Sequence, residues 1–201
     1  MTSTLDFFTS LHARVFGVIE RLGDRWLLGM IARFAFAAVL LNYFLHSANT
    51  KVGEGLLGFF SISPGAYYQI ALPAVEAAGG DVSAVPFFPW GLLVVMGTYA
   101  EFILPLLIVI GLFSRLAALG MIGFIAVQTF VDITVHQIGA ESIGTWFDRF
   151  PDAIIADQRL LWLVPLAVII IKGPGVLSLD AWLGRAHGGK AAYAPAMKSA
   201  S

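Results

Sequence analysis

The chain contains no cysteine among its 201 residues. This absence excludes disulfide bonds, thiol redox chemistry, thiolate metal sites and cysteine nucleophiles. Charged residues are also scarce: they make up 12% of the chain, about half of the roughly 25% that is usual in soluble domains. The 12 basic and 13 acidic residues nearly balance, so nothing indicates nucleic-acid binding. The chain also lacks the motifs of a serine-hydrolase elbow, a phosphate loop and a zinc protease.

Apolar residues, by contrast, make up 58% of the chain and concentrate in four runs, at about 26–46, 89–112, 116–136 and 152–172. A helix needs roughly 20 apolar residues to cross a bilayer. The strictly apolar part of the last run, 160–171, would rise only about 18 Å as a helix. We therefore expect this helix to begin after Asp152, a suitable N-cap, and to include Arg159. The pattern predicts an all-α fold, an integral membrane four-helix bundle.

Lysine and arginine residues are distributed unevenly around these runs. Eight of them lie in segment 1–25, in the short hairpin near residue 115, or at and beyond the end of the fourth run. Only Lys51 and Arg149 lie in the two longer loops. Because cytoplasmic segments are enriched in lysine and arginine, we expect both termini to be cytoplasmic. Segment 1–25 is then a cytoplasmic N-terminal segment, and the small, polar stretch 184–201 is expected to be a disordered cytoplasmic tail.

Several polar residues fall inside the expected spans, where ionisable groups are costly and usually face partners or cavities. The set consists of Arg33, Asn42, Glu101, Gln128, Asp132 and Arg159. An arginine at position 159 can reach Glu101 or Asp132, and Arg33 can extend toward Glu101. Two interpretations remain open. The residues form either a buried ion network that holds the helices in register, or the lining of a cavity for a small polar or quinone-like ligand or of a proton path.

A weaker pattern lies near one end of the expected bundle. Asp132 and His136 are one helical turn apart on the third run, and His46 ends the first run. Two histidines and a carboxylate can hold a divalent metal ion. Hydrated side chains at a membrane interface explain the same pattern better. We therefore assign no metal site and keep these three residues as weak candidates.

Two motifs and two single residues carry a family resemblance. The stretch from Gly111 to Leu119 reads GLFSRLAAL, with Arg115 in its middle, and 173–180 reads GPGVLSLD. Together with Arg33 in the first run and Glu101 in the second, these motifs resemble the DoxX family, whose hairpin reads G-L-x-[ST]-R-x-A-A. The family's first helix often ends in Gly-x-x-Lys, and the corresponding stretch at 48–51 reads Ala-Asn-Thr-Lys here.

The resemblance covers about 26–183 and implies a multi-pass protein of the bacterial inner membrane. It also implies an accessory subunit of respiratory or redox metabolism, rather than a stand-alone enzyme, and no residue is assigned a catalytic role. Such a subunit would contact the lipid bilayer and bind a redox protein partner or a second copy of itself, and a quinone is the candidate ligand. A small-solute or metal transporter and a structural membrane scaffold remain as alternatives.

Overall fold

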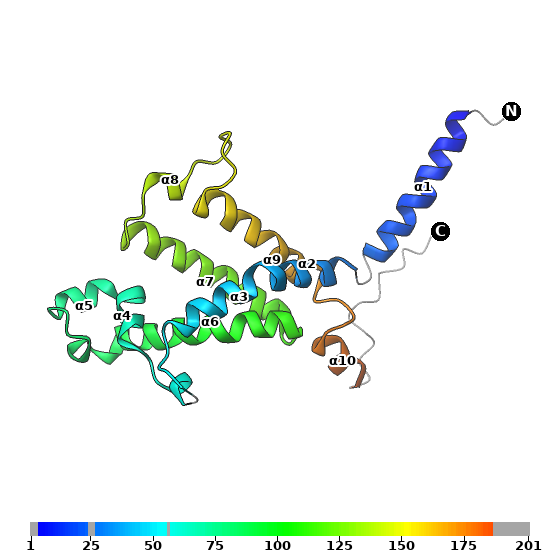
Figure 1. Cartoon of the computed structure of the whole chain (residues 1–201). Helices are drawn as coiled ribbons and strands as arrows, with labels where there is room; N and C mark the ends of the chain where they lie inside the picture. The colour runs from blue at the N-terminus through cyan, green and yellow to red at the C-terminus, as the bar shows by residue number, and fades with distance from the viewer. Residues whose placement is uncertain (1–3, 24–26, 56, 187–201) are drawn as a thin grey trace.

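The computed structural model describes residues 4–23, 27–55 and 57–186, and these residues are mostly helical (Figure 1). Four helical segments are long and apolar enough to cross a membrane. Within the described ranges, extended pairing is limited to a single bridge between Val52 and Ile62. The expectation of an all-α fold with four helices long and apolar enough to cross a membrane is therefore confirmed.

The four spans cover Leu28–Asn49, Phe87–Ile110, Ser114–Thr134 and Ile154–Lys172. Their lengths of 19 to 24 residues correspond to about 28–36 Å of helix. This length matches a hydrocarbon layer of roughly 30 Å. At most 28% of the apolar window of each span is buried, so most of their apolar surface faces outward, as lipid-facing helices require.

Three of the spans contain a π-helical stretch, labelled η, next to their α-helices. The first span consists of α2 (Leu28–Phe36), η2 (Ala37–Leu41) and α3 (Asn42–Asn49). The second span consists of η5 (Phe87–Gly91) and α6 (Leu92–Ile110), and the third is α7 (Ser114–Thr134). The fourth span consists of η6 (Ile154–Arg159) and α9 (Leu160–Lys172). Other elements lie outside the spans. They are the 19-residue helix α1 (Thr4–Leu22), the short helices α4 (Pro64–Ile70), α5 (Leu72–Ala77), α8 (Ala140–Ile143) and α10 (Leu179–Ala186), and two 3₁₀ turns, η3 (Gly58–Phe60) and η4 (Val82–Ala84).

Each span packs against two of the others, in the circular order first, fourth, third, second. Helix α9 packs against α2 and α7, while α6 packs against α7 and α3. The four spans enclose a core of large apolar side chains, among which Phe36, Phe44, Met121 and Leu166 are almost fully buried. Each span thus has one narrow face toward the others, and the rest of its surface is left for lipid.

The turn between α6 and α7 is formed by residues 111–113. Gly111 has a positive φ of 75°, the left-handed conformation that glycine supplies at helix C-termini. The N–H groups of Gly111 and Leu112 both donate to the Leu107 carbonyl. Ser114 and Arg115 therefore belong to the first turn of α7, rather than to the connection between the helices.

The last carbonyls of α6 are satisfied by an arginine from the first span. Arg33 donates from Nε to the Ile108 carbonyl at 3.1 Å and from Nη2 to the Val109 carbonyl. Its Nη1 donates to the carbonyls of Pro174 and Leu177 at 3.2 and 2.6 Å. The final carbonyls of a helix have no intrahelical donor and carry partial negative charge. Arg33 therefore stabilises the end of α6 and joins it to the turn that follows α9.

The N-terminus of α7 is capped by a carboxylate from α10. The N-cap residue, Phe113, has no side-chain acceptor of its own. Asp180 instead accepts hydrogen bonds from the backbone N–H of Phe113 at 2.8 Å, and from the backbone N–H and Oγ of Ser114 at 2.9 and 2.7 Å. A carboxylate is favourable at a helix N-terminus. We call Arg33, Gly111, Ser114, Asp180 and the turn 173–178 the hairpin clamp.

Two short helices, α4 and α5, cover the part of α6 that lies away from the hairpin clamp. The chain leaves helical geometry at Ala71, two residues before Pro73. A proline has no N–H and cannot bond to the carbonyl four residues earlier, which here belongs to Gln69. Nε2 of His136 lies 3.0 Å from that carbonyl oxygen. The break between α4 and α5 thus offers an acceptor that ties them to the end of α7.

Close contact between the first span and the turn after α9 requires glycine at position 29. A Cβ there would collide with the carbonyl oxygen of Gly173 and lie 2.7 Å from the nitrogen of Gly175. We expect Gly29→Ala to reduce the free energy of unfolding by about 1–3 kcal/mol, the usual cost of overpacking. The measurement is the melting temperature of the purified protein in detergent. Gly123→Ala is the matched control, because nothing lies within 4 Å of its added Cβ. Equal melting temperatures for the two variants would contradict this contact.

Candidate functional site

The polar residues of the spans do not form one network. Arg33 belongs to the hairpin clamp. Two ion pairs form, one between Glu101 and Lys51 and the other between Asp132 and Arg159. Gln128 donates to the hydroxyl of Tyr43, and Asn42 is exposed at the start of α3. The expectation that Arg33 extends toward Glu101 is wrong, because the arginine is held at the end of α6. Of the two partners considered for Arg159, the structure selects Asp132.

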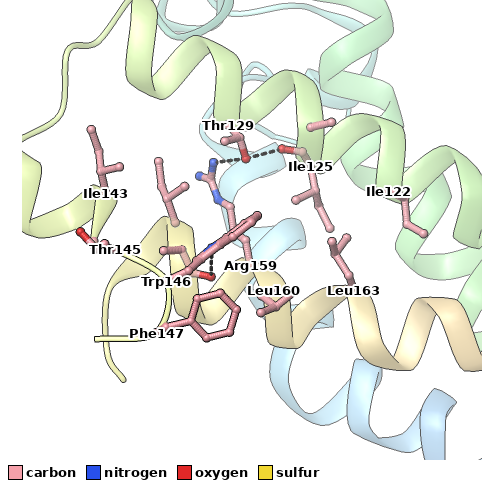
Figure 2. A pocket seen from close by; sticks show the side chains of 14 residues that line it. Ile122, Ile125, Thr129, Ile143, Thr145, Trp146, Phe147, Arg159, Leu160 and Leu163 are labelled. Carbon is pink, nitrogen blue, oxygen red and sulfur yellow. Dashed lines mark hydrogen bonds between the residues drawn. The ribbon is translucent and has the colours of Figure 1, made fainter. Parts of the chain in front are cut away.

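Arg159 is the central polar group between the third and fourth spans, and it is 4% exposed. Its Nη1 donates to Oγ1 of Thr129 at 2.6 Å, and its Nη2 pairs with the carboxylate of Asp132. The Thr129 hydroxyl in turn donates to the Ile125 carbonyl at 2.7 Å (Figure 2). Nε of Arg159 is buried and has no hydrogen-bond partner among the described residues. The described residues therefore leave the Nε–H of this cation unused.

The start of the fourth span positions Arg159. The N-cap of this span is Ala153, not the expected Asp152. The N–H of Ala153 donates to Oδ2 of Asp157 at 3.0 Å, so a carboxylate inside the first turn reaches back to the helix start, as in a capping box. The span begins with π-helical turns, which hold more residues per turn than an α-helix. Arg159 closes this stretch and faces α7.

A cavity of about 730 Å³ lies beside Arg159, between α7, the start of the fourth span and residues 143–147 (Figure 2). Its lining consists of Ile122, Ile125, Ala126, Thr129, Ile143, Gly144, Thr145, Trp146, Phe147, Ile155, Ala156, Arg159, Leu160 and Leu163. The indole of Trp146 is oriented by a hydrogen bond of 3.2 Å to the Ala156 carbonyl. The volume falls within the range of about 300–1,000 Å³ that is usual for ligand pockets.

The polar groups of the cavity favour one kind of ligand. The charge of Arg159 is already balanced by Asp132, so a second anion would find no net positive charge there. The Nε–H of the guanidinium can only donate, and a donor of this kind suits a neutral acceptor such as a carbonyl oxygen. Most of the lining is aliphatic or aromatic. The site can therefore bind an apolar molecule that carries a carbonyl group at one end.

A second buried ion pair was missed by the sequence reasoning. Nζ of Lys51 lies 2.8 Å from Oε2 of Glu101, and the two side chains are 4% and 7% exposed. The same ammonium group donates to Oγ of Ser47 at 2.8 Å. The sequence places Lys51 in one of the two longer loops. In the structure the first span continues to Asn49, which brings the lysine against α6. The only sequence signal was the lysine that ends the first helix in the DoxX family.

The three weak metal candidates do not come together. Asp132 is paired with Arg159, His136 contacts a backbone carbonyl, and His46 is exposed. Throughout the described ranges, no group of three histidine, cysteine, aspartate or glutamate side chains can hold a metal ion.

Gln128 lies on α7, one turn before Asp132. Its Oε1 is buried without a partner within the described part of the chain.

Arg115 is exposed in the first turn of α7. One of its terminal nitrogens lies 3.5 Å from the Ile171 carbonyl, at the outer limit of hydrogen bonding. Gly111, the other hairpin residue singled out in the sequence, is buried in the clamp, where an added Cβ would collide with Ser178. The clamp therefore depends on the glycine, whereas the arginine lies at its edge.

Comparison of the chain with protein-family models, curated proteins and solved structures finds no match. The geometry of the chain itself is thus the basis for any functional assignment. In that geometry, several polar and glycine residues that lie far apart in the sequence are in contact. Arg33, Gly111 and Asp180 meet in the hairpin clamp, and Lys51 meets Glu101.

The pairing of Arg159 with Asp132 predicts a specific energetic coupling. Asp132→Asn and Arg159→Gln should each destabilise the protein, because each leaves an uncompensated charge. Removing one partner of a fully buried pair costs about 3–5 kcal/mol, and we expect less here because the Asp132 side chain is 24% exposed. The double variant should recover part of the loss. The measurement is a double-mutant cycle on unfolding in detergent.

The matched control is the cycle of Glu101→Gln with Arg159→Gln. These two residues belong to different ion pairs, so their effects should add within about 0.5 kcal/mol. Strong coupling between Glu101 and Arg159, or simple additivity between Asp132 and Arg159, would contradict the pairing described above.

Proposed function

We propose that the chain is a DoxX-like protein of the bacterial inner membrane that binds a quinone in the cavity beside Arg159. Its role is that of an accessory subunit in respiratory or redox metabolism. The observation that carries this proposal is the cavity itself, with apolar walls and one buried guanidinium whose charge is balanced and whose Nε–H is unused.

A quinone matches this site in shape and chemistry. It has a neutral planar ring, carbonyl oxygens that accept hydrogen bonds, and an apolar tail that dissolves in the bilayer. Ile122, Leu160 and Leu163 form an apolar wall, and Trp146 is placed to contact a ring (Figure 2). The carbonyl would accept from Nε of Arg159, while Thr129 and Asp132 hold the guanidinium in place.

The accessory role rests on what the chain itself can supply. It has no cysteine and no catalytic motif, so its residues offer a place for a lipid-soluble redox carrier rather than a path for electrons. A redox protein partner would then exchange electrons with the bound quinone. The contacts among the family-type residues in the hairpin clamp support the resemblance that led to this role.

Quinone binding is tested by titrating decylubiquinone into the protein in phosphatidylcholine nanodiscs and following quenching of tryptophan fluorescence. Ala126→Phe fills the cavity and should abolish saturable quenching. Arg159→Lys keeps the charge opposite Asp132 but lacks the Nε–H, and should weaken binding about tenfold, as expected for a lost hydrogen bond to a charged group. Ala38→Phe is the matched control, because Ala38 is exposed on η2 outside the cavity, and it should bind like the wild type.

Equal affinities of the Ala126→Phe and Ala38→Phe variants would overturn the proposed site. Absence of saturable quenching in the wild type would overturn the quinone assignment. Transport of a small solute or metal ion by the protein reconstituted alone would instead favour the transporter. A protein that neither binds quinone nor moves solute, but is needed for assembly of a complex, would favour the scaffold.

The proposal places both termini in the cytoplasm. Of the two basic residues in the long loops, Lys51 is buried in an ion pair, which leaves Arg149 as an exposed cation there. The side that holds the two termini and the turn between α6 and α7 therefore exceeds the side of the long loops in exposed basic residues by more than the sequence alone indicated. Such an excess of lysine and arginine favours a cytoplasmic location for that side.

A reporter test measures this orientation in a bacterial host. Green fluorescent protein fused after residue 201 should fluoresce, because it folds in the cytoplasm. Alkaline phosphatase inserted at Gly80 should be active, because it needs the external side. Gly80 lies in an exposed turn, and nothing lies within 4 Å of a Cβ added there, so we expect room for an insertion. A fusion that does not fluoresce, or an inserted phosphatase that is inactive, would contradict the proposed orientation.

A further inference from the structure

The N-terminal helix α1 has one continuous apolar face. Phe8, Leu11, Val15 and Val18 follow one another at intervals of three or four residues, and Ile19 lies four residues after Val15, so all five lie on one side of the helix. All five are between 46% and 64% exposed. Figure 1 shows α1 standing apart from the four spans. The apolar face therefore has no cover from the described part of the chain.

The charged residues of α1 lie away from this face. At 100° per residue, Arg14 and Arg21 fall at one edge of the apolar arc, while Asp6 and Glu20 fall near the middle of the polar side. Two basic and two acidic residues leave the helix almost neutral. Its attraction to a surface must therefore come from the apolar face, with the arginines placed to reach phosphate groups at the boundary.

The position of α1 in the chain brings it to the bilayer. It ends at Leu22, and the first span begins at Leu28. The intervening residues can extend over no more than about 20 Å, so the end of α1 remains near the point where the first span enters the membrane. The outer face of that span is itself lipid-exposed, since Ile31 and Phe34 are 51% and 74% exposed. The apolar face of α1 and the outer face of the first span can thus contact the same lipid layer.

We infer that α1 is an interfacial helix. It lies along the bilayer surface with Leu11 and Val15 in the headgroup boundary, on the side where the first span begins. A helix of 19 residues in this position anchors the N-terminal segment beside the hairpin clamp. This inference is independent of quinone binding, because it rests on a surface far from the cavity.

The absence of cysteine allows a clean test on the full-length protein. Single cysteines at Leu11, Val15, Ala13 and Glu20 are labelled with a nitrobenzoxadiazole fluorophore in phosphatidylcholine vesicles. Brominated phosphatidylcholine should quench the labels at positions 11 and 15 at least about threefold more than those at 13 and 20, as expected for a helix lying in the interface. Aqueous iodide should show the reverse order. A label at Phe34, on the lipid-exposed face of α2, is the positive control for lipid quenching.

Two results would overturn the inference. Equal quenching by iodide at all four positions of α1 would mean that the helix is surrounded by water or is not formed. Labels at positions 11 and 15 that are protected from both quenchers would mean that protein covers the apolar face, either a partner or a second copy of the chain. Quenching by brominated lipid with the three-to-four-residue period supports the interfacial position.

Discussion

The structure depends on the fact that hydrocarbon offers no hydrogen-bond partners, so each polar group at membrane depth must find one within the protein. The hairpin clamp shows this constraint at the two helix ends that meet there. Arg33 donates to the last carbonyls of α6, and Asp180 accepts from the first N–H groups of α7. One cation and one anion, from opposite ends of the chain, thus supply partners for helix-end groups that the residues of the turn do not reach.

The same constraint explains the two buried ion pairs, but the pairs differ in their surroundings. Lys51 and Glu101 are both nearly inaccessible, and neither lines the cavity. Arg159 is also paired, yet it forms part of a cavity wall and retains a donor without a partner in the described ranges. Each ion pair therefore fits a different interpretation: Lys51 with Glu101 fits a structural role in setting helix register, and Arg159 fits the ligand site that we propose.

The N-terminal segment shows how a local pattern can be overlooked beside stronger ones. The spacing of Phe8, Leu11, Val15 and Ile19 has the period of an amphipathic helix, but four longer apolar runs dominate the hydropathy of this chain. From the sequence, segment 1–25 is expected only to be a cytoplasmic N-terminal segment, whereas α1 occupies most of it. The outcome for the tail is different: residues 184–186 belong to α10, and the rest of 184–201 lies outside the described residues.

The sequence by itself determined the four spans, their approximate bounds and the inclusion of Arg159 in the fourth, because apolar length and helix periodicity are local properties. Partner choice was not determined, because it depends on how helices tilt and rotate against one another. Glu101 pairs with Lys51, from beyond the expected end of the first helix, and Arg159 selects Asp132. The cavity likewise exists only in three dimensions, because its walls come from two spans and a loop that are separated in the chain.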